Sequence, residues 1–186
     1  CNELTHRTDS EEILCSLEQK GLFIVKVQSQ GSSPVYRYHH LFAEVLQKEF
    51  RKIYTQEAIN EIIEEAVVIL YDKGDKLFAI ELCIQNGLYE QAQQWIAKDI
   101  IELSASNMIY TYIRWLKNLQ NKVLFVPYEI LIVGYNHAIT TVDHELATSI
   151  MEELDARQQL FHWMEEPEYK ELAEIYDRTK AYALVA

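Results

Sequence analysis

The residues of this sequence that could bind a metal or a phosphate are mainly histidines, and two of them are adjacent. His39 and His40 lie together, with His6 further up the chain. Adjacent side chains diverge, and no cysteine or acidic residue has the spacing that would complete a tetrahedral metal site. His137 and His144 lie on either side of a predicted turn, which is typical of a solvated loop pair. We therefore expect no metal site.

Catalytic motifs are absent from the sequence. It contains no GxxxxGK followed by Ser or Thr, no GxSxG, no HExxH and no paired CxxC. Three glutamate pairs, Glu64-Glu65, Glu152-Glu153 and Glu165-Glu166, are more typical of solvated helix faces than of acid–base pairs. No group of residues predicts a reaction, so we expect that the chain is not an enzyme.

A set of aromatic residues has two interpretations. They could line a concave ligand-binding surface, or, at helical spacing, they could pack helices together. The sequence favours packing without excluding the ligand surface. The residues are Tyr110, Tyr112, Trp115, Phe161, Trp163, Tyr169, Tyr176 and Tyr182.

The element that positions His39 begins as a strand and continues as a helix. Residues 35–38 are β-branched or aromatic at three of four positions, and the apolar residues from Leu41 to Phe50 have helical spacing. Before them the sequence predicts a helix capped at Asp9 or Ser10 and ended by Gly21, and then a strand over 22–27. Helix, hairpin and helix form the second half of a winged-helix unit.

A winged helix often binds DNA through the helix that precedes its hairpin. Here that helix carries Glu11, Glu12 and Glu18 and has no basic residue before Lys20. Such a helix is poorly suited to a phosphate-lined groove, so we expect a packing module and no direct contact with nucleic acid.

From residue 56 onward the sequence predicts helices joined by short turns, which makes antiparallel neighbours. They include single helices over 88–103 and 168–184, and the sequence predicts an extended segment over residues 123–126. Small residues flank two of the turns: Ala79, Cys83 and Ala92 around Asn86-Gly87, and Ala138 and Ala147 around Val142-Asp143. This pattern resembles a tetratricopeptide-like array, and an irregular helical bundle is the alternative.

Charge divides the chain in the same place. Residues 1–54 contain seven basic and seven acidic residues, whereas residues 55–186 contain ten and twenty-two and so hold the whole net charge of −12. An acidic surface repels nucleic acid and anionic lipid, and no apolar run approaches the roughly 20 residues that span a bilayer. We expect two domains, 1–54 and 55–186.

Cysteine usage and the first residue suggest the setting. Three widely spaced cysteines, Cys1, Cys15 and Cys83, are typical of free thiols in a reducing cytoplasm. Because the sequence has no initiator methionine, we expect it to be part of a longer protein.

The order of these features resembles a known family. CNELTHRTDSEEILCSLEQKGLFIV, VYRYHHLFAEVLQKEF and EEAVVILYDKGDKLFAIELCIQNGLYEQAQQWI are similar to MalT-like, LuxR-family ATP-dependent transcriptional regulators, which are signal-transduction ATPases of the STAND class. The resemblance implies the end of a winged-helix domain followed by the start of a superhelical, TPR-like sensor region. A nucleotide-binding module would precede it, and a DNA-binding domain would follow.

The resemblance implies a role for one residue. In the wider class a winged-helix histidine contacts the β-phosphate of bound ADP, and His39 in the stretch Tyr38 to Phe42 aligns with it. His40 stands where the wider class often has an acid, so the resemblance implies no role tied to that acid here. ATP or ADP is expected only for the full-length protein, and the alternative for His39 is packing at the strand–helix junction.

Two hypotheses of function follow. In the first, the helical region senses a small-molecule inducer or a protein effector, and the winged helix couples that event to the nucleotide module of the same chain. In the second, the chain is a stand-alone helical scaffold that binds other proteins through its acidic face. A nucleotide-binding module upstream of Cys1 would favour the first.

Overall fold

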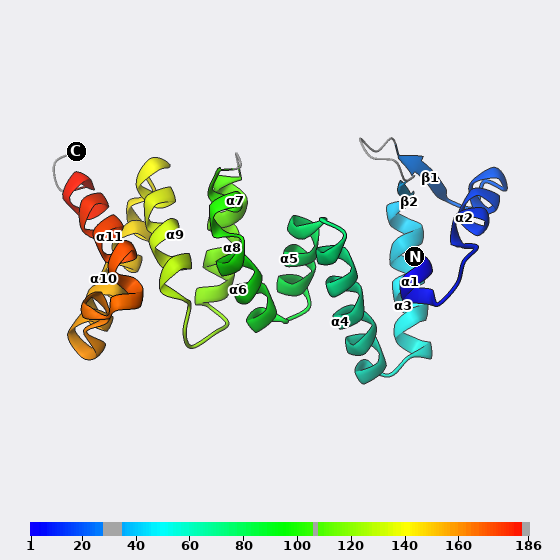
Figure 1. Ribbon diagram of the computed structural model, residues 1–186. Helices are drawn as coiled ribbons and strands as arrows, with labels where there is room; N and C mark the ends of the chain where they lie inside the picture. Colours follow the sequence, from blue (N-terminus) through cyan, green and yellow to red (C-terminus); the bar gives the residue numbers. More distant parts are fainter. Residues whose placement is uncertain (28–34, 106–107, 184–186) are drawn as a thin grey trace. The chain divides into compact units, whose positions relative to one another are not determined.

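The structure is a computed structural model, and it describes residues 1–27, 35–105 and 108–183. Over these ranges the protein is mainly helical, with one antiparallel pair of strands (Figure 1), which confirms the predicted fold class. It divides into two compact units, Cys1–Ala79 (unit 1) and Ile80–Ala186 (unit 2). The boundary lies within helix α5 (Lys76–Gln85). The domain boundary predicted after residue 54 separates the winged helix from the helical region, whereas this boundary separates compact units. The predicted boundary stays a prediction.

Unit 1 has the predicted order of helix, hairpin and helix. Gly21, with a φ of 68°, follows the first long helix as expected. The strand after it begins at Ile24, later than predicted, because Phe23 also has a positive φ, of 57°. The short helix α1 has no counterpart in the sequence prediction. The elements are α1 (Asn2–Thr5), α2 (Ser10–Gln19), β1 (Ile24–Val27), β2 (Val35–Tyr38), α3 (His40–Ile53) and α4 (Gln56–Asp72).

Register and packing in unit 1 are simple. In the hairpin, Ile24 pairs with Tyr38 and Val27 with Val35. The predicted polar turn over residues 28–34 lies outside the described residues. Helix α1 packs against α4, and the carboxylate of Glu3 forms an exposed ion pair of 2.7 Å with Lys73.

The helix α3 exposes an apolar surface. None of its residues is buried. Apolar side chains on one side of it are instead exposed, and we call this set the open face of unit 1. It comprises Leu41, Val45, Leu46 and Ile53.

Unit 2 consists of helices joined by short turns, as predicted, with one break that was not predicted. The helix expected over 88–103 ends at Lys98 and a second begins at Ile100, because Asp99 interrupts it; aspartate is favoured where a new helix starts. Residues 123–126 form no strand, and the last helix begins at Lys170. The elements after α5 are α6 (Tyr89–Lys98), α7 (Ile100–Ala105), α8 (Ile109–Gln120), α9 (Tyr128–Thr140), α10 (His144–Phe161), η1 (Trp163–Glu165), η2 (Pro167–Tyr169) and α11 (Lys170–Ala183).

Helix α9 is the centre of unit 2. It packs against α8, α10 and α11, and also contacts α6 and α7 (Figure 1). It is apolar around most of its circumference, as expected of a helix covered on several sides. Its buried residues are Tyr128, Ile130, Leu131, Ile132, Gly134, Tyr135, His137 and Ala138.

The two turns singled out in the sequence have the same backbone hydrogen bonds. After α5, the N–H of Gly87 donates to Ile84 and that of Leu88 donates to Cys83. After α9, the N–H of Val142 donates to the carbonyl oxygen of Ile139, and the N–H of Asp143 donates to that of Ala138. This pair of bonds is the Schellman motif, which places one residue in the left-handed region. Gly87 has a φ of 80° and Val142 a φ of 58° there.

A glycine allows α8 and α9 to approach closely. A Cβ atom added to Gly134 would lie 2.1 Å from Cδ2 of Leu116 and 3.6 Å from Cδ1 of Ile150. Both neighbours are fully buried. Small residues at helix contacts were expected, although Gly134 itself was not identified.

The arrangement agrees with a mainly helical fold of antiparallel neighbours. The more specific tetratricopeptide-like assignment stays a prediction. Within the described residues, no helix has both the length and the apolar character needed to cross a membrane.

Candidate functional site

His39 lies between the second strand and the third helix. It caps the N-terminus of α3 with φ −58° and ψ 135°, and its backbone N–H donates a 2.7 Å hydrogen bond to the carbonyl oxygen of Phe23. That bond ties the start of α3 to the start of β1. The backbone position of His39 is therefore fixed by the hairpin.

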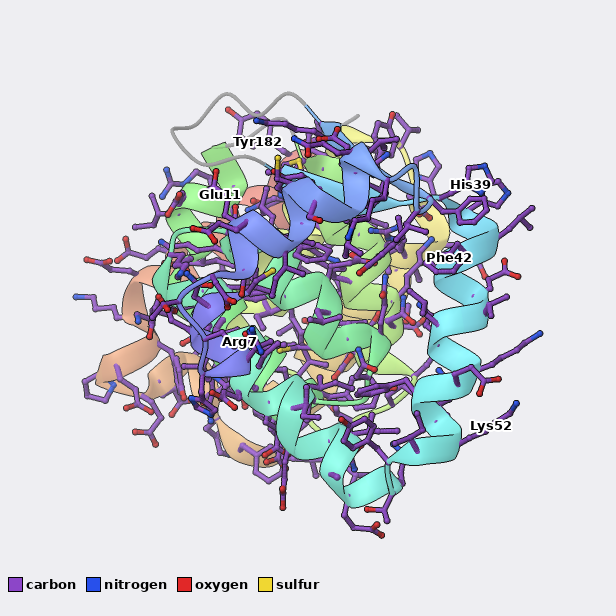
Figure 2. The ribbon with its side chains drawn as sticks, turned by 90° about the vertical axis from the view of Figure 1, so that its right-hand side faces the viewer. Arg7, Glu11, His39, Phe42, Lys52 and Tyr182 are labelled. Carbon is purple, nitrogen blue, oxygen red and sulfur yellow. The ribbon has the colours of Figure 1, made fainter. Side chains whose placement is uncertain are left out.

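The imidazole of His39 points away from this junction. It is exposed, forms no capping hydrogen bond to α3, and its ring centroid lies 4.5 Å from that of His40. Figure 2 shows it at the start of α3, at the opposite end from Lys52. The first turn of α3 contains no acidic residue. Free N–H groups of a first turn favour an anion, so this end could present an imidazole and backbone donors to a phosphate.

The helix that would read DNA, α2, is acidic in the structure as well. Glu11 and Glu12 lie in its exposed first turn (Figure 2 labels Glu11). Glu18 accepts a 2.8 Å hydrogen bond from the backbone N–H of Lys26 in β1. Arg7, a base near this helix, is paired with Asp9 at 2.8 Å.

Unit 2 contains a pocket of about 480 Å³. This volume is within the usual range for small-molecule sites. Helix α6, the connector between α8 and α9, the start of α9 and the turn η2 all contribute to it. Its lining residues are Glu90, Gln93, Gln94, Ala97, Phe125, Pro127, Tyr128, Glu129 and Tyr169.

Aromatic rings form one side of this pocket. The ring centroid of Tyr128 lies 5.7 Å from that of Phe125 and 4.9 Å from that of Tyr169, both edge to face. Behind it, Trp163 stacks on Tyr128 at 4.7 Å and donates through Nε1 to the carbonyl oxygen of Leu154. Tyr128 and Trp163 are buried, so the wall is rigid, whereas Phe125 is 50% exposed.

Arg157 on α10 holds the connector in place. Its Nη1 donates to the carbonyl oxygen of Val126 at 2.7 Å, and its guanidinium pairs with Glu153. The guanidinium carbon lies 4.1 Å from the ring centroid of Phe125 and 5.3 Å from that of Tyr128. Arg157 is only 8% exposed, so these contacts replace its water shell.

The aromatic residues of the sequence divide between the two interpretations. Four of them, Tyr112, Trp115, Trp163 and Tyr176, are buried and pack helices together, while Tyr169 lines the pocket. The remaining three, Tyr110, Phe161 and Tyr182, are exposed and do not belong to that pocket. Packing is the main role, as the sequence favoured.

His137 does not belong to a solvated loop pair. It lies on α9, it is 8% exposed, and its ring meets Tyr112 edge to face at 5.1 Å. Its Nε2 is buried and has no hydrogen-bond partner among the described residues. Burial lowers the pKa of His137 below 6.5, because the charged imidazolium loses its hydration. The loop prediction was wrong because α9 is covered on the side that carries His137, whereas His144 is exposed.

Sequence reasoning missed the pocket. It identified Tyr169 among the aromatic residues but none of the other residues that line the pocket. The sequence contained one usable signal, the aromatic residue at position 125 in the connector before Pro127, since loops carry binding residues more often than their share of the chain.

Comparison with known protein families gives a match for the first part of the chain. Residues 1–58, just under a third of the chain, match the family model of the MalT winged helix domain. No curated protein matches the chain, and no solved structure does. The match covers α1 to α3, the hairpin and the start of α4, so this part of the chain is similar to the MalT winged helix domain and agrees with the predicted winged-helix fold.

Proposed function

We propose that this chain is the regulatory part of a MalT-like transcriptional regulator of the LuxR family and STAND class. The winged-helix unit docks on a nucleotide-binding module, and the helical unit receives the signal. The match of residues 1–58 to the MalT winged helix domain is the observation that carries this proposal. The chain acts through conformation and catalyses no reaction of its own.

The open face of unit 1 supports the docking role. An apolar helix surface without a buried residue is unusual for an isolated unit and typical of an interaction surface. His39 lies two residues before Leu41, the first residue of this surface along the chain. A module covering the open face would therefore approach the imidazole.

Nucleotide is the cofactor of the full-length protein in this proposal. His39 fits a phosphate, since its imidazole is exposed and no acidic side chain lies in the first turn of α3. It would donate a hydrogen bond to the β-phosphate of ADP and so hold the resting state. Bound nucleotide supplies the energy difference between resting and active states. The packing alternative for His39 is less favoured because its ring is exposed.

The helical unit is the sensor in this proposal. Its pocket has the size of a small-molecule site, although a protein effector is also compatible with an exposed helical surface. A ligand shifts the regulator only if it binds one conformation more tightly than the other. DNA would be read by a separate domain, because α2 is acidic, and the regulator would work in the cytoplasm without contacting a membrane.

The second hypothesis, a stand-alone scaffold, is not favoured. It does not explain why residues 1–58 match the MalT winged helix domain.

The experiment measures release of a fluorescent ADP analogue from the full-length regulator. We expect His39→Ala to speed release about tenfold, the effect of losing one charge-assisted hydrogen bond. His144→Ala is the matched control, since it removes an exposed imidazole at the start of another helix, α10, and should leave the rate unchanged. Equal rates for wild type and His39→Ala would contradict the role of His39, and a full-length protein that binds no nucleotide would contradict the proposed function.

A further inference from the structure

The pocket of unit 2 has an acidic lining. Glu90 and Glu129 contribute two carboxylates, and none of the described residues that line it is basic. Glu90 is exposed and Glu129 is half-buried, so both can reach a ligand. Two carboxylates at one small pocket oppose the binding of an anion and attract a cation.

A second observation indicates the same negative field. Burial is the largest cause of the raised pKa of the Tyr169 hydroxyl, and Glu168, Glu129 and Tyr128 raise this pKa further. A neighbouring negative charge makes loss of the phenolic proton harder. Of the two carboxylates, only Glu129 lines the pocket, so the Tyr169 hydroxyl senses part of the negative charge that a ligand would meet.

The aromatic residues add a cation-binding surface of a different kind. The faces of aromatic rings attract cations, most strongly where water is excluded. Phe125 already binds one cation in this structure, since the Arg157 guanidinium lies 4.1 Å from its ring centroid. The residue is nevertheless 50% exposed. Arg157 does not oppose a second cation strongly, because Glu153 balances its charge.

The N-terminus of α9 is the main feature that would favour an anion instead. Its free N–H groups are positive, but Glu129 lies in that same first turn and offsets them. A neutral polyol could use the amides of Gln93 and Gln94, yet it would leave the two carboxylates without a charged partner. Cation recognition satisfies the amides, the carboxylates and the rings together.

We propose that this pocket binds an organic cation, in which an ammonium or guanidinium group is carried on a short apolar stem. The charged group would lie between Glu90 and Glu129, and the stem would lie against Phe125 and Tyr169. This inference rests on the proposed function, since it names the class of signal that the helical unit receives.

The test measures binding of agmatine and 1,5-diaminopentane to the intact protein by calorimetry, with tryptophan fluorescence as a second readout. Trp163 stacks on Tyr128, so occupation of the pocket should change its emission. We expect binding that weakens as salt is raised, and no comparable binding of 1,5-pentanediol or glutarate. A capped arginine peptide distinguishes a free amine from a protein side chain: if it binds more tightly than agmatine, the cation comes from a partner protein.

Variants then locate the site. Glu129→Gln and Glu90→Gln should each weaken agmatine binding about tenfold, and Phe125→Leu about fivefold. Glu145→Gln is the matched control, because Glu145 lies in the first turn of α10 as Glu129 lies in that of α9, and is outside the pocket. Circular dichroism confirms that each variant is folded.

Two results would overturn this inference: the diol binding as tightly as the diamine, or Glu129→Gln behaving like Glu145→Gln. Either would leave the proposed function standing, since ADP release by His39→Ala is measured without any pocket ligand. Conversely, cation binding in a protein that binds no nucleotide would support the pocket and contradict the regulatory proposal.

Discussion

Arg157 of α10 donates a 2.7 Å hydrogen bond from Nη1 to the carbonyl oxygen of Val126, in the connector that precedes α9. The same guanidinium pairs with Glu153 and lies over Phe125. One buried side chain thus joins a helix to the loop that forms part of the pocket. The pocket depends on this contact although Arg157 does not line it.

Replacing this arginine should loosen the connector. We expect Arg157→Met to lower the free energy of unfolding by about 3 kcal/mol, because the buried Val126 carbonyl loses its donor and the Glu153 carboxylate loses its ion-pair partner. Chemical denaturation measures the change. Arg114→Met is the control, since Arg114 forms an exposed ion pair with Glu81 and should cost well under about 1 kcal/mol. Equal losses for the two variants would contradict the anchoring role.

A glycine at residue 142 should stabilise the turn after α9. Val142 is β-branched and has a φ of 58°, a region in which its side chain is strained. We expect Val142→Gly to raise the free energy of unfolding by about 1 kcal/mol, and Gly87→Val, in the matching turn, to lower it by about 1–2 kcal/mol. Thermal unfolding of both variants measures the pair, and changes of the same sign would show that the two turns are not equivalent.

The contact of α8 with α9 should not tolerate a methyl group. Alanine favours a helix by about 1 kcal/mol over glycine, but the added Cβ of Gly134→Ala would meet Leu116 at 2.1 Å. We expect the clash to dominate and the variant to lose about 2 kcal/mol. Combining it with Leu116→Ala should cost less than the sum of the two single changes. Strict additivity in this double-mutant cycle would mean that the two residues do not touch.

His137 should make the protein less stable in acid. Its pKa is lowered by burial, so below the unfolded value near 6.5 the unfolded chain binds a proton that the folded chain does not. The contribution of His137 to the free energy of unfolding is therefore fully present above pH 6.5. It decreases as the pH falls toward the folded pKa. We expect His137→Leu to gain stability relative to wild type, by more at pH 5 than at pH 7.5, measured by denaturation at both values. A gain independent of pH would show that His137 titrates alike in both states.

The secondary structure was largely predictable because it depends on local signals. Gly21, Asp143 and Pro127 stand where helices end or begin, and Asp143 indeed accepts a hydrogen bond from the N–H of Leu146. The break at Asp99 was missed because the apolar spacing continues through it.

The pocket was not predictable in the same way, because its residues come together only through packing. Glu90 and Glu129 are far apart in the sequence, and each has an ordinary explanation as a first-turn acid. His137 illustrates the same limit. Its neighbours in sequence suggested a loop, while its environment is set by Tyr112 on another helix.

The central claim is that this chain couples a signal received by the helical unit to nucleotide held beside the winged helix. The most direct measurement is the rate of nucleotide exchange in the full-length regulator, with and without a saturating pocket ligand, in wild type and in Glu129→Gln. The account predicts that the ligand changes the rate in wild type, and that Glu129→Gln needs about tenfold more ligand for the same change. A rate that never responds to any ligand or partner acting through residues 55–186 would contradict it.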